Sequence, residues 1–130
     1  MESKTFKYCL LQYMHSQVLR EVVNIGIFFQ FSDGVLFFKH PDSFERIKGL
    51  YEDFSEVQLK ENLEAILFKV NRLNESPKQM PLSTKFSDVI RKDATVLQLS
   101  ETKTSLRDGD YRRTMDQYFD LYFAVYYQTK

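Results

Sequence analysis

Arg20, Glu21 and Asn24 are the residues of this 130-residue chain whose types and spacing best suit chemistry. They stand where a polar loop leads into the apolar run Val22–Phe31, and Gly26 follows them within that run. An arginine guanidinium presents a planar fork of donors that matches a carboxylate or a phosphate. Glycine inside a strand often marks the close approach of a ligand or of another backbone. These residues predict a small site for an anionic ligand, and the alternative is a hydrogen-bonded network that only fixes the loop.

The two histidines and the single cysteine lack the sequence context of a catalytic or metal site. His15 and His40 are expected at the ends of the first and third strands. A metal or acid–base site there would need a further ligand, such as Asp42 or Glu21, and no motif of the H-E-x-x-H or C-x-x-C type occurs. Cys9 lies within an apolar strand, where a buried and unreactive thiol is expected. We therefore predict no catalytic residue, no metal site and no cofactor.

The most distinctive segment is the aromatic-rich predicted helix from Tyr111 to about Tyr127. Its rings spread around a helical wheel instead of forming one stripe, so packing on a single sheet would bury only some of them. Tyrosine at an interface supplies contact area together with a hydroxyl hydrogen bond. The segment predicts a surface for a partner protein or for a second copy of the chain, with interface residues Tyr118, Tyr122, Tyr126 and Tyr127. A helix clamped within the core is the alternative.

The balance of charge disfavours nucleic acid as a partner. The chain has 18 basic and 18 acidic residues, whereas nucleic-acid binders usually carry a basic excess because counterion release drives their affinity. The charge is uneven, since residues 42–64 hold seven acidic and three basic side chains while residues 78–113 hold five acidic and eight basic. Two solvated faces would explain this pattern, and a dipolar protein steered onto a charged partner is the sharper interpretation.

Length and hydropathy predict one domain over residues 1–130. No apolar run approaches the roughly 18 residues that cross a membrane, and the first residues lack the pattern of a signal peptide. One cysteine permits no internal disulfide. We therefore expect a cytoplasmic protein with no membrane partner.

Hydrophobic periodicity predicts three consecutive strands at the start of the chain. Thr5–Met14 carries apolar side chains on both faces and is expected to be central. Val22–Phe31 is expected to turn its odd-numbered residues to the core. The Ser32-Asp33-Gly34 loop and the run Val35–Lys39 then predict a hairpin.

Helices and one more strand are predicted beyond the hairpin. Asp42 is expected to cap a short helix, and a capping box of Ser55 and Gln58 opens the clearest one. The core positions of that second helix are Leu59, Leu63, Ile66, Val70 and Leu73. Further elements are expected at residues 83–91 (helix), 95–100 (strand, with an extension to 104) and 111–127 (helix capped by Asp110). The sequence thus predicts an α+β domain, in which an antiparallel sheet of about four strands is packed by three to four helices, mostly on one face.

Two stretches in the first strands carry a family resemblance. Tyr8–Tyr13 (YCLLQY) is followed, after a short loop, by Arg20–Ile27 (REVVNIGI). This pattern of Y-x-L-L-x-Y and then R-E with V-N-x-G-V resembles an uncharacterised bacterial family catalogued as domain of unknown function 3037. Residues 44–73 and 97–103 also look like the family, whereas the aromatic final helix departs from it. The resemblance implies no reaction, but it implies a partner protein, namely a HipA-like kinase encoded nearby.

These observations lead to an expected function with one alternative. We expect a non-enzymatic protein-interaction or accessory domain of a bacterial or phage system, bound to another protein or assembled as a homo-oligomer. The alternative is a small anionic-ligand-binding or enzymatic domain that uses the region of Arg20, Glu21 and Asn24.

Overall fold

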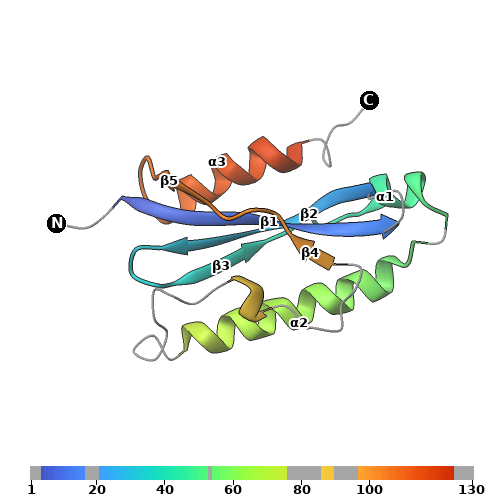
Figure 1. The fold of residues 1–130 in the computed structure, drawn as a ribbon, viewed down its shortest axis with the longest axis horizontal. Coiled ribbons are helices and arrows are strands. Elements are labelled where there is room, and N and C mark those ends of the chain that lie inside the picture. Colours follow the sequence, from blue (N-terminus) through green and yellow to red (C-terminus); the bar gives the residue numbers. More distant parts are fainter. Residues whose placement is uncertain (1–3, 17–20, 53, 76–85, 90–96, 125–130) are drawn as a thin grey trace.

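An antiparallel sheet forms the middle layer of the protein, with helices on both of its faces (Figure 1). The computed structural model describes residues 4–16, 21–52, 54–75, 86–89 and 97–124. The strands of this described part are β1 (Thr5–Ser16), β2 (Glu21–Phe31), β3 (Leu36–Lys39), β4 (Leu97–Leu99) and β5 (Lys103–Leu106). The strand order is β3-β2-β1-β4, and β5 also pairs with β1. The predicted α+β class, with three consecutive antiparallel strands, is confirmed.

The helices divide between the two faces of the sheet. α2 (Glu56–Asn74) packs on one face together with the short helix α1 (Glu45–Leu50) and the 3-10 turn η2 (Phe86–Val89). α3 (Tyr111–Phe123) covers the opposite face (Figure 1). Most of the helices therefore share one face, as predicted, and β1 is central and covered on both sides.

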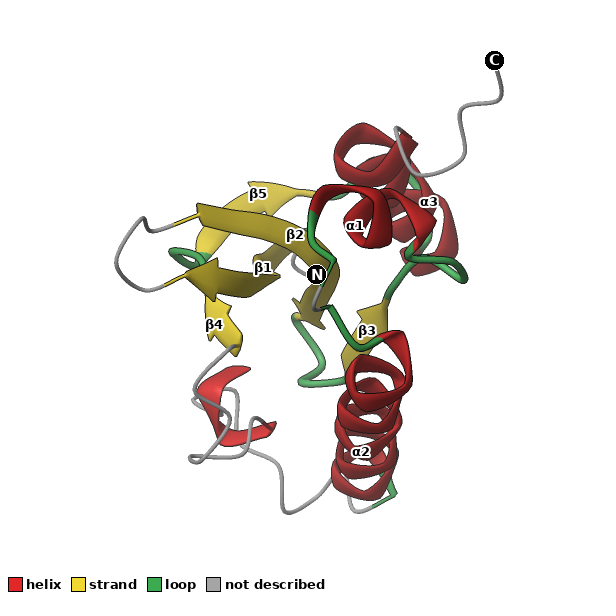
Figure 2. Cartoon of the chain, turned by 90° about the vertical axis from the view of Figure 1, so that its right-hand side faces the viewer, coloured by secondary structure: helices red, strands yellow, loops and turns green. Residues whose placement is uncertain are grey.

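β4 and β5 are two pieces of one edge of the sheet. β4 pairs with Leu11–Tyr13 and β5 pairs with Thr5–Tyr8, so both lie along β1 (Figure 2). Between them, the backbone N–H of Ser100 donates to the Leu10 carbonyl at 2.9 Å, and the Leu10 N–H donates to Ser100 Oγ at 2.8 Å. The side chain of Ser100 thus replaces a backbone acceptor, which interrupts the predicted fourth strand and makes its extension a separate element.

The predicted hairpin between β2 and β3 is confirmed. Gly34 has a φ of 89°, a conformation that side-chain-bearing residues rarely adopt, and its N–H donates to the Phe31 carbonyl at 2.9 Å. Asp33 Oδ1 accepts a hydrogen bond from the Val35 N–H at 3.1 Å. The turn is therefore stabilised by the Asp-Gly pair that predicted it.

The alternation of β2 reverses at Ile25, which corrects the prediction that its odd-numbered residues share a single core face. Ile25 has no partner in the pairing of β2 with β1 and is the extra residue of a bulge. It therefore joins Phe28 on the α2 side, while Ile27, Phe29 and Phe31 lie on the α3 side. All five side chains are buried because helices cover both faces.

Two of the predicted helix caps are present. Ser55 Oγ accepts a hydrogen bond from the Gln58 N–H at 3.2 Å at the start of α2. Asp110 Oδ1 accepts one from the Arg113 N–H at 2.8 Å at the start of α3. Each cap pairs one of the N–H groups that the first turn of a helix leaves without an intrahelical acceptor.

The predicted cap of α1 by Asp42 is wrong. The N-cap residue of α1 is Phe44, and no side chain of its own caps it. The Phe44 N–H instead donates to Glu56 Oε1 at 3.3 Å, and Lys48 forms an ion pair with Glu56 at 3.3 Å. A carboxylate from the next helix thus binds the N-cap backbone, and Ser43 Oγ accepts a hydrogen bond from the Glu45 N–H at 3.4 Å.

Four of the five predicted core residues of α2 are buried, namely Leu59, Leu63, Ile66 and Val70, and Leu73 is half-buried. Of the helix predicted at residues 83–91, η2 is the described part. Residues 95–96 of the predicted strand and 125–127 of the predicted last helix lie outside the described residues.

The core has two parts, one on each face of the sheet. The α2-side core mixes aliphatic and aromatic residues, and its buried members are Cys9, Leu11, Ile25, Phe28, Leu36, Phe38, Phe44, Ile47, Phe54, Leu59, Leu63, Ile66, Val70, Phe86, Val89 and Leu97. The α3-side core is mainly aromatic. Its buried members are Phe6, Tyr8, Leu10, Ile27, Phe29, Phe31 and Phe123, and Phe37, Tyr111, Met115, Tyr118, Phe119 and Tyr122 pack partly buried against them.

Candidate functional site

The sheet separates the described members of the predicted anion site. Arg20 lies outside the described residues. Glu21 is the exposed first residue of β2 and interacts with Tyr51, which packs against the α2-side core. Asn24 lies three positions further along the strand, and its side chain points to the other face because strand side chains alternate. Glu21 and Asn24 therefore do not converge on a shared ligand position.

Asn24 belongs to a row of amide side chains that crosses three strands. Its Oδ1 accepts a hydrogen bond from Gln12 Nε2 at 3.0 Å. Gln12 Oε1 in turn accepts one from Gln98 Nε2 at 2.9 Å. These partly buried bonds connect β2, β1 and β4, and they give Asn24 a part in holding the sheet.

Glu21 belongs to a second cluster, which surrounds Tyr51. The rings of Tyr51 and His15 stack with centroids 3.7 Å apart and planes 12° apart. The Tyr13 hydroxyl lies 3.2 Å from His15 Nδ1. Burial raises the pKa of Tyr51, and the Glu21 carboxylate raises it further through its charge and through the hydrogen bond that it accepts. The hydroxyl of Tyr51 therefore stays protonated near neutral pH and serves as a donor.

His40 makes a different set of contacts. Its Nδ1 donates to the Pro41 carbonyl at 2.8 Å, and its ring packs beside Phe38 and Phe44. In the described residues, no group of three His, Cys, Asp or Glu side chains is arranged to hold a metal ion. The contacts given above for His15 and for His40 involve different residues. These contacts therefore do not bring the two histidines together.

Cys9 is buried in the α2-side core, as predicted. Burial raises the pKa of its thiol to about 12. The thiolate is the nucleophilic form of cysteine, so this side chain is unreactive at neutral pH.

Tyr118 and Tyr122 pack on the sheet with their rings half-buried. Tyr118 meets the rings of Phe6 and Tyr8 edge-on, at centroid distances of 5.2 Å and 4.9 Å. Its hydroxyl lies 2.8 Å from Ser105 Oγ, and the Tyr122 hydroxyl lies 3.4 Å from that of Tyr8. These two tyrosines hold α3 against the sheet, and their part in a partner interface stays a prediction. Tyr126 and Tyr127 lie outside the described residues.

The outward face of α3 is polar apart from one large apolar side chain. A shallow depression there is lined by Asp110, Arg112, Arg113, Asp116, Gln117 and Asp120. Leu121 stands one helical turn beyond Gln117 and is 72% exposed. Asp116 also forms an ion pair with Lys39 of β3 at 2.8 Å, and this hydrogen bond and charge hold the pKa of Asp116 below its usual range.

Sequence reasoning missed both the amide row and the Tyr51 cluster. The amide row depends on which residues face each other across strands, and the Tyr51 cluster depends on where the segment after α1 meets the ends of β1 and β2. The amides of Gln12 and Gln98 gave no signal, since isolated polar residues in strands usually face solvent.

The class of protein that the described structure shows is an α+β domain. The side chains considered above for chemistry take part in packing this fold. Within that class, a family model described as protein of unknown function, DUF3037, matches residues 8–123. The chain belongs to this family, as the resemblance in the first strands predicted. No curated protein and no solved structure matches the chain significantly. Among the described helices, none has the length and apolar character that crossing a bilayer requires.

Proposed function

We propose that this chain is a non-enzymatic accessory domain that acts by binding another protein through the outward face of α3. This outward face is defined by Arg112, Arg113, Asp116, Gln117, Asp120 and Leu121. The observation that carries the proposal is the exposure of Leu121 on a helix whose inner side is fixed to the sheet by aromatic rings.

The composition of this surface suits a protein partner. Interfaces commonly place an apolar anchor within a polar rim, and a rigid anchor loses little conformational entropy on binding. Leu121 would be such an anchor, and the charged side chains of Arg113 and Asp120 would form part of the rim. Charges of both signs there would favour one orientation of the partner.

The exposed apolar side chains of α2 offer a weaker surface. Phe68 is 63% exposed, but the guanidinium of Arg72 lies 5.8 Å from its ring centroid. Val57 is 71% exposed at the first turn of the helix, where Glu56 and Lys60 form an ion pair at 3.6 Å. Neither side chain sits over an aromatic layer like the one that supports α3.

The described residues also offer little to an enzyme. Cys9 is buried with a raised pKa, His40 is bonded to a backbone carbonyl, and Asn24 is bonded within the amide row. The alternative function, a small anionic-ligand or enzymatic site using Arg20, Glu21 and Asn24, has less support because its two described members face opposite sides of the sheet.

The partner would be a HipA-like kinase if the association implied by the family resemblance holds. A second copy of the chain is the other candidate. Tyr126 and Tyr127 stay predicted interface residues, and they lie outside the described residues.

Affinity purification of the tagged chain from its own host, with mass spectrometry and light scattering of the eluate, tests the proposal. We expect a stoichiometric partner that is lost with Leu121→Asp. Val57→Asp is the matched control, because it places the same charge at an equally exposed apolar position of another helix. We expect this control to retain the partner.

Two results would contradict the proposal. One is a monomer that recovers no stoichiometric protein. The other is a partner retained by Leu121→Asp as fully as by the wild type.

A further inference from the structure

Gln30 is a buried polar residue whose amide nitrogen is unsatisfied. It lies in β2 and is 4% exposed, and in the described structure its Nε2 has no hydrogen-bond partner. A buried donor without an acceptor is costly, and natural proteins tolerate few of them. Such a group is expected where a bound molecule supplies the missing acceptor.

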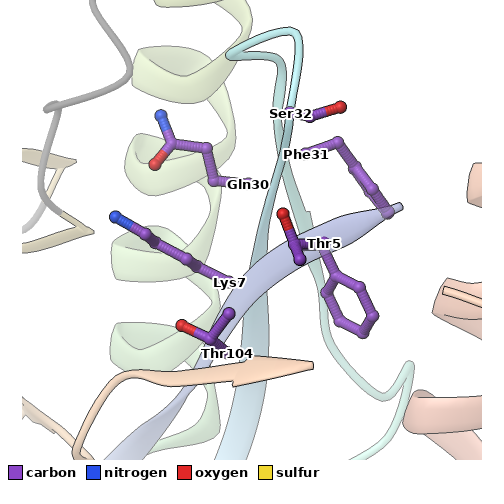
Figure 3. Close-up of a pocket in the computed structure, with 7 residues that line it drawn as sticks. Thr5, Lys7, Gln30, Phe31, Ser32 and Thr104 are labelled. Carbon is purple, nitrogen blue, oxygen red and sulfur yellow. The ribbon is translucent and has the colours of Figure 1, made fainter. Parts of the chain in front are cut away.

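A pocket of about 280 Å³ adjoins this amide (Figure 3). It is lined by Thr5, Phe6, Lys7, Gln30, Phe31, Ser32 and Thr104. Lys7 of β1 pairs with Gln30 on one side and with Thr104 of β5 on the other, so the three side chains share one face of the sheet. Figure 3 shows Lys7 and Gln30 extending to the same side from neighbouring strands.

Lys7 supplies a positive charge to the pocket. The ion pairs of the described residues involve Lys39, Lys48 and Lys60, and none involves Lys7. Among the described residues that line the pocket, none is acidic. An ammonium group on the same face of the sheet as an unsatisfied amide donor favours a ligand that carries a negative charge and hydrogen-bond acceptors.

The size of the donor set favours a carboxylate over a phosphate. Phosphate is usually held by an arginine fork, by a helix N-terminus or by several backbone N–H groups. The described part of the lining contains one lysine, one amide and hydroxyl groups, and no arginine. The rings of Phe6 and Phe31 pack in the α3-side core on the opposite face of the sheet, so the side chains of Lys7, Gln30 and Thr104 on the pocket's face are polar, which suits a short carboxylate.

We propose that this pocket binds a small organic monocarboxylate, whose oxygens accept hydrogen bonds from Gln30 Nε2 and from the ammonium group of Lys7. The Thr104 hydroxyl, on the same face, is the third polar contact. The site is separate from the outward face of α3, so either proposal can fail without the other.

Thermal unfolding of the full chain with acetate, butyrate and benzoate, each at matched ionic strength, tests this assignment. We expect at least one of them to raise Tm by about 5 °C at saturation. Inorganic phosphate is expected to give no shift, and a shift as large as that of the carboxylates would overturn the choice of ligand class.

Gln30→Met separates a ligand site from a mere packing defect. The variant removes the unsatisfied amide, so we expect it to fold with a Tm at or above that of the wild type. We also expect it to lose the shift caused by the carboxylate. A shift of equal size in Gln30→Met would overturn the proposal, as would the absence of a shift with every carboxylate in the wild type.

A pair of lysine variants tests whether the ammonium group of Lys7 binds the carboxylate. Lys7→Met is expected to weaken binding at least tenfold, as measured by titration calorimetry. Lys103→Met is the control, because Lys103 pairs with Tyr8 and its side chain lies on the other face of the sheet. Equal affinities of the two variants would contradict the role of Lys7.

Discussion

The two faces of the sheet are packed in different ways. On the α2 side, a 19-residue helix buries four aliphatic side chains, and α1 and η2 extend the cover. On the α3 side, a 13-residue helix buries only Thr114 and Phe123, and half-buried rings supply most of the remaining contact. The comparison indicates that the α2 side provides most of the stability. The α3 side holds a helix in place while leaving its outer face available.

Aromatic packing explains how a helix with so few buried residues can be held. Tyr111 stacks on Phe31 with centroids 3.8 Å apart, and Tyr118 meets three rings of the sheet edge-on. Each such pair contributes about 0.5–1.5 kcal/mol beyond the burial of area. The Tyr118 hydroxyl pairs with Ser105 Oγ, and the Tyr122 hydroxyl pairs with that of Tyr8.

The largest expected effect is a cavity on the α2 side. Leu63→Ala removes a fully buried side chain of α2 and should lower the free energy of unfolding by about 3 kcal/mol. Urea denaturation followed by circular dichroism measures the loss. Leu121→Ala, the same substitution on the outer face of α3, should change it by less than about 0.5 kcal/mol. Similar losses at the two positions would contradict the difference between the faces.

Overpacking next to the bulge should have the second-largest effect on the free energy of unfolding. A Cβ atom on Gly26 would lie 2.5 Å from Cε1 of Phe38 and 3.3 Å from the Lys39 carbonyl oxygen. Gly26→Val is therefore expected to cost about 2 kcal/mol, because Phe38 must move within the α2-side core. Repacking with Phe38→Leu in the same chain should recover part of the loss. Wild-type stability of the single variant would show that β2 does not approach β3 so closely.

A smaller effect is expected from one hydroxyl of the α3-side core. Tyr118→Phe keeps the ring contacts and removes the hydrogen bond with Ser105, so it should cost about 1 kcal/mol. The double variant with Ser105→Ala should cost little more than Tyr118→Phe alone, because both substitutions remove the same bond. Additive losses in this cycle would argue against the bond.

The smallest effect should depend on pH. The pKa of Glu56 is lowered: desolvation opposes the shift, but the hydrogen bond from the Phe44 N–H and the charges of Lys48 and Lys60 outweigh it. A lowered pKa in the folded state stabilises the fold above the ordinary glutamate pKa of about 4.3, and this stabilisation is lost as pH falls through the folded value. Glu56→Gln should therefore be less stable than the wild type at pH 7, and the difference should vanish near pH 2–3. A difference that persists in acid would assign the effect to packing.

The sequence predicted the elements of this fold better than their partners. The hairpin around Gly34, the caps at Ser55 and Asp110 and the apolar stripe of α2 are local patterns, and all are present. The side of Ile25 was predicted wrongly because a bulge reverses the alternation.

Contacts between residues far apart in the sequence also determine which side chains of the candidate sites lie together. Glu21 and Asn24 are three residues apart in sequence, yet they face opposite sides of the sheet. Gln30 gave no signal in the sequence, because its significance depends on the cover that buries it and on Lys7 across the strand pair. The tyrosines of α3 were recognised as distinctive, but the helical wheel alone did not place Tyr118 and Tyr122 on the sheet side.

Hydrogen–deuterium exchange, measured on the free chain and on the complex recovered from its host, tests the central claim most directly. We predict that the partner slows exchange along α3, while exchange in α2 is unchanged. Protection confined to α2, or no protection in either helix, would contradict the claim that the outward face of α3 is the binding surface.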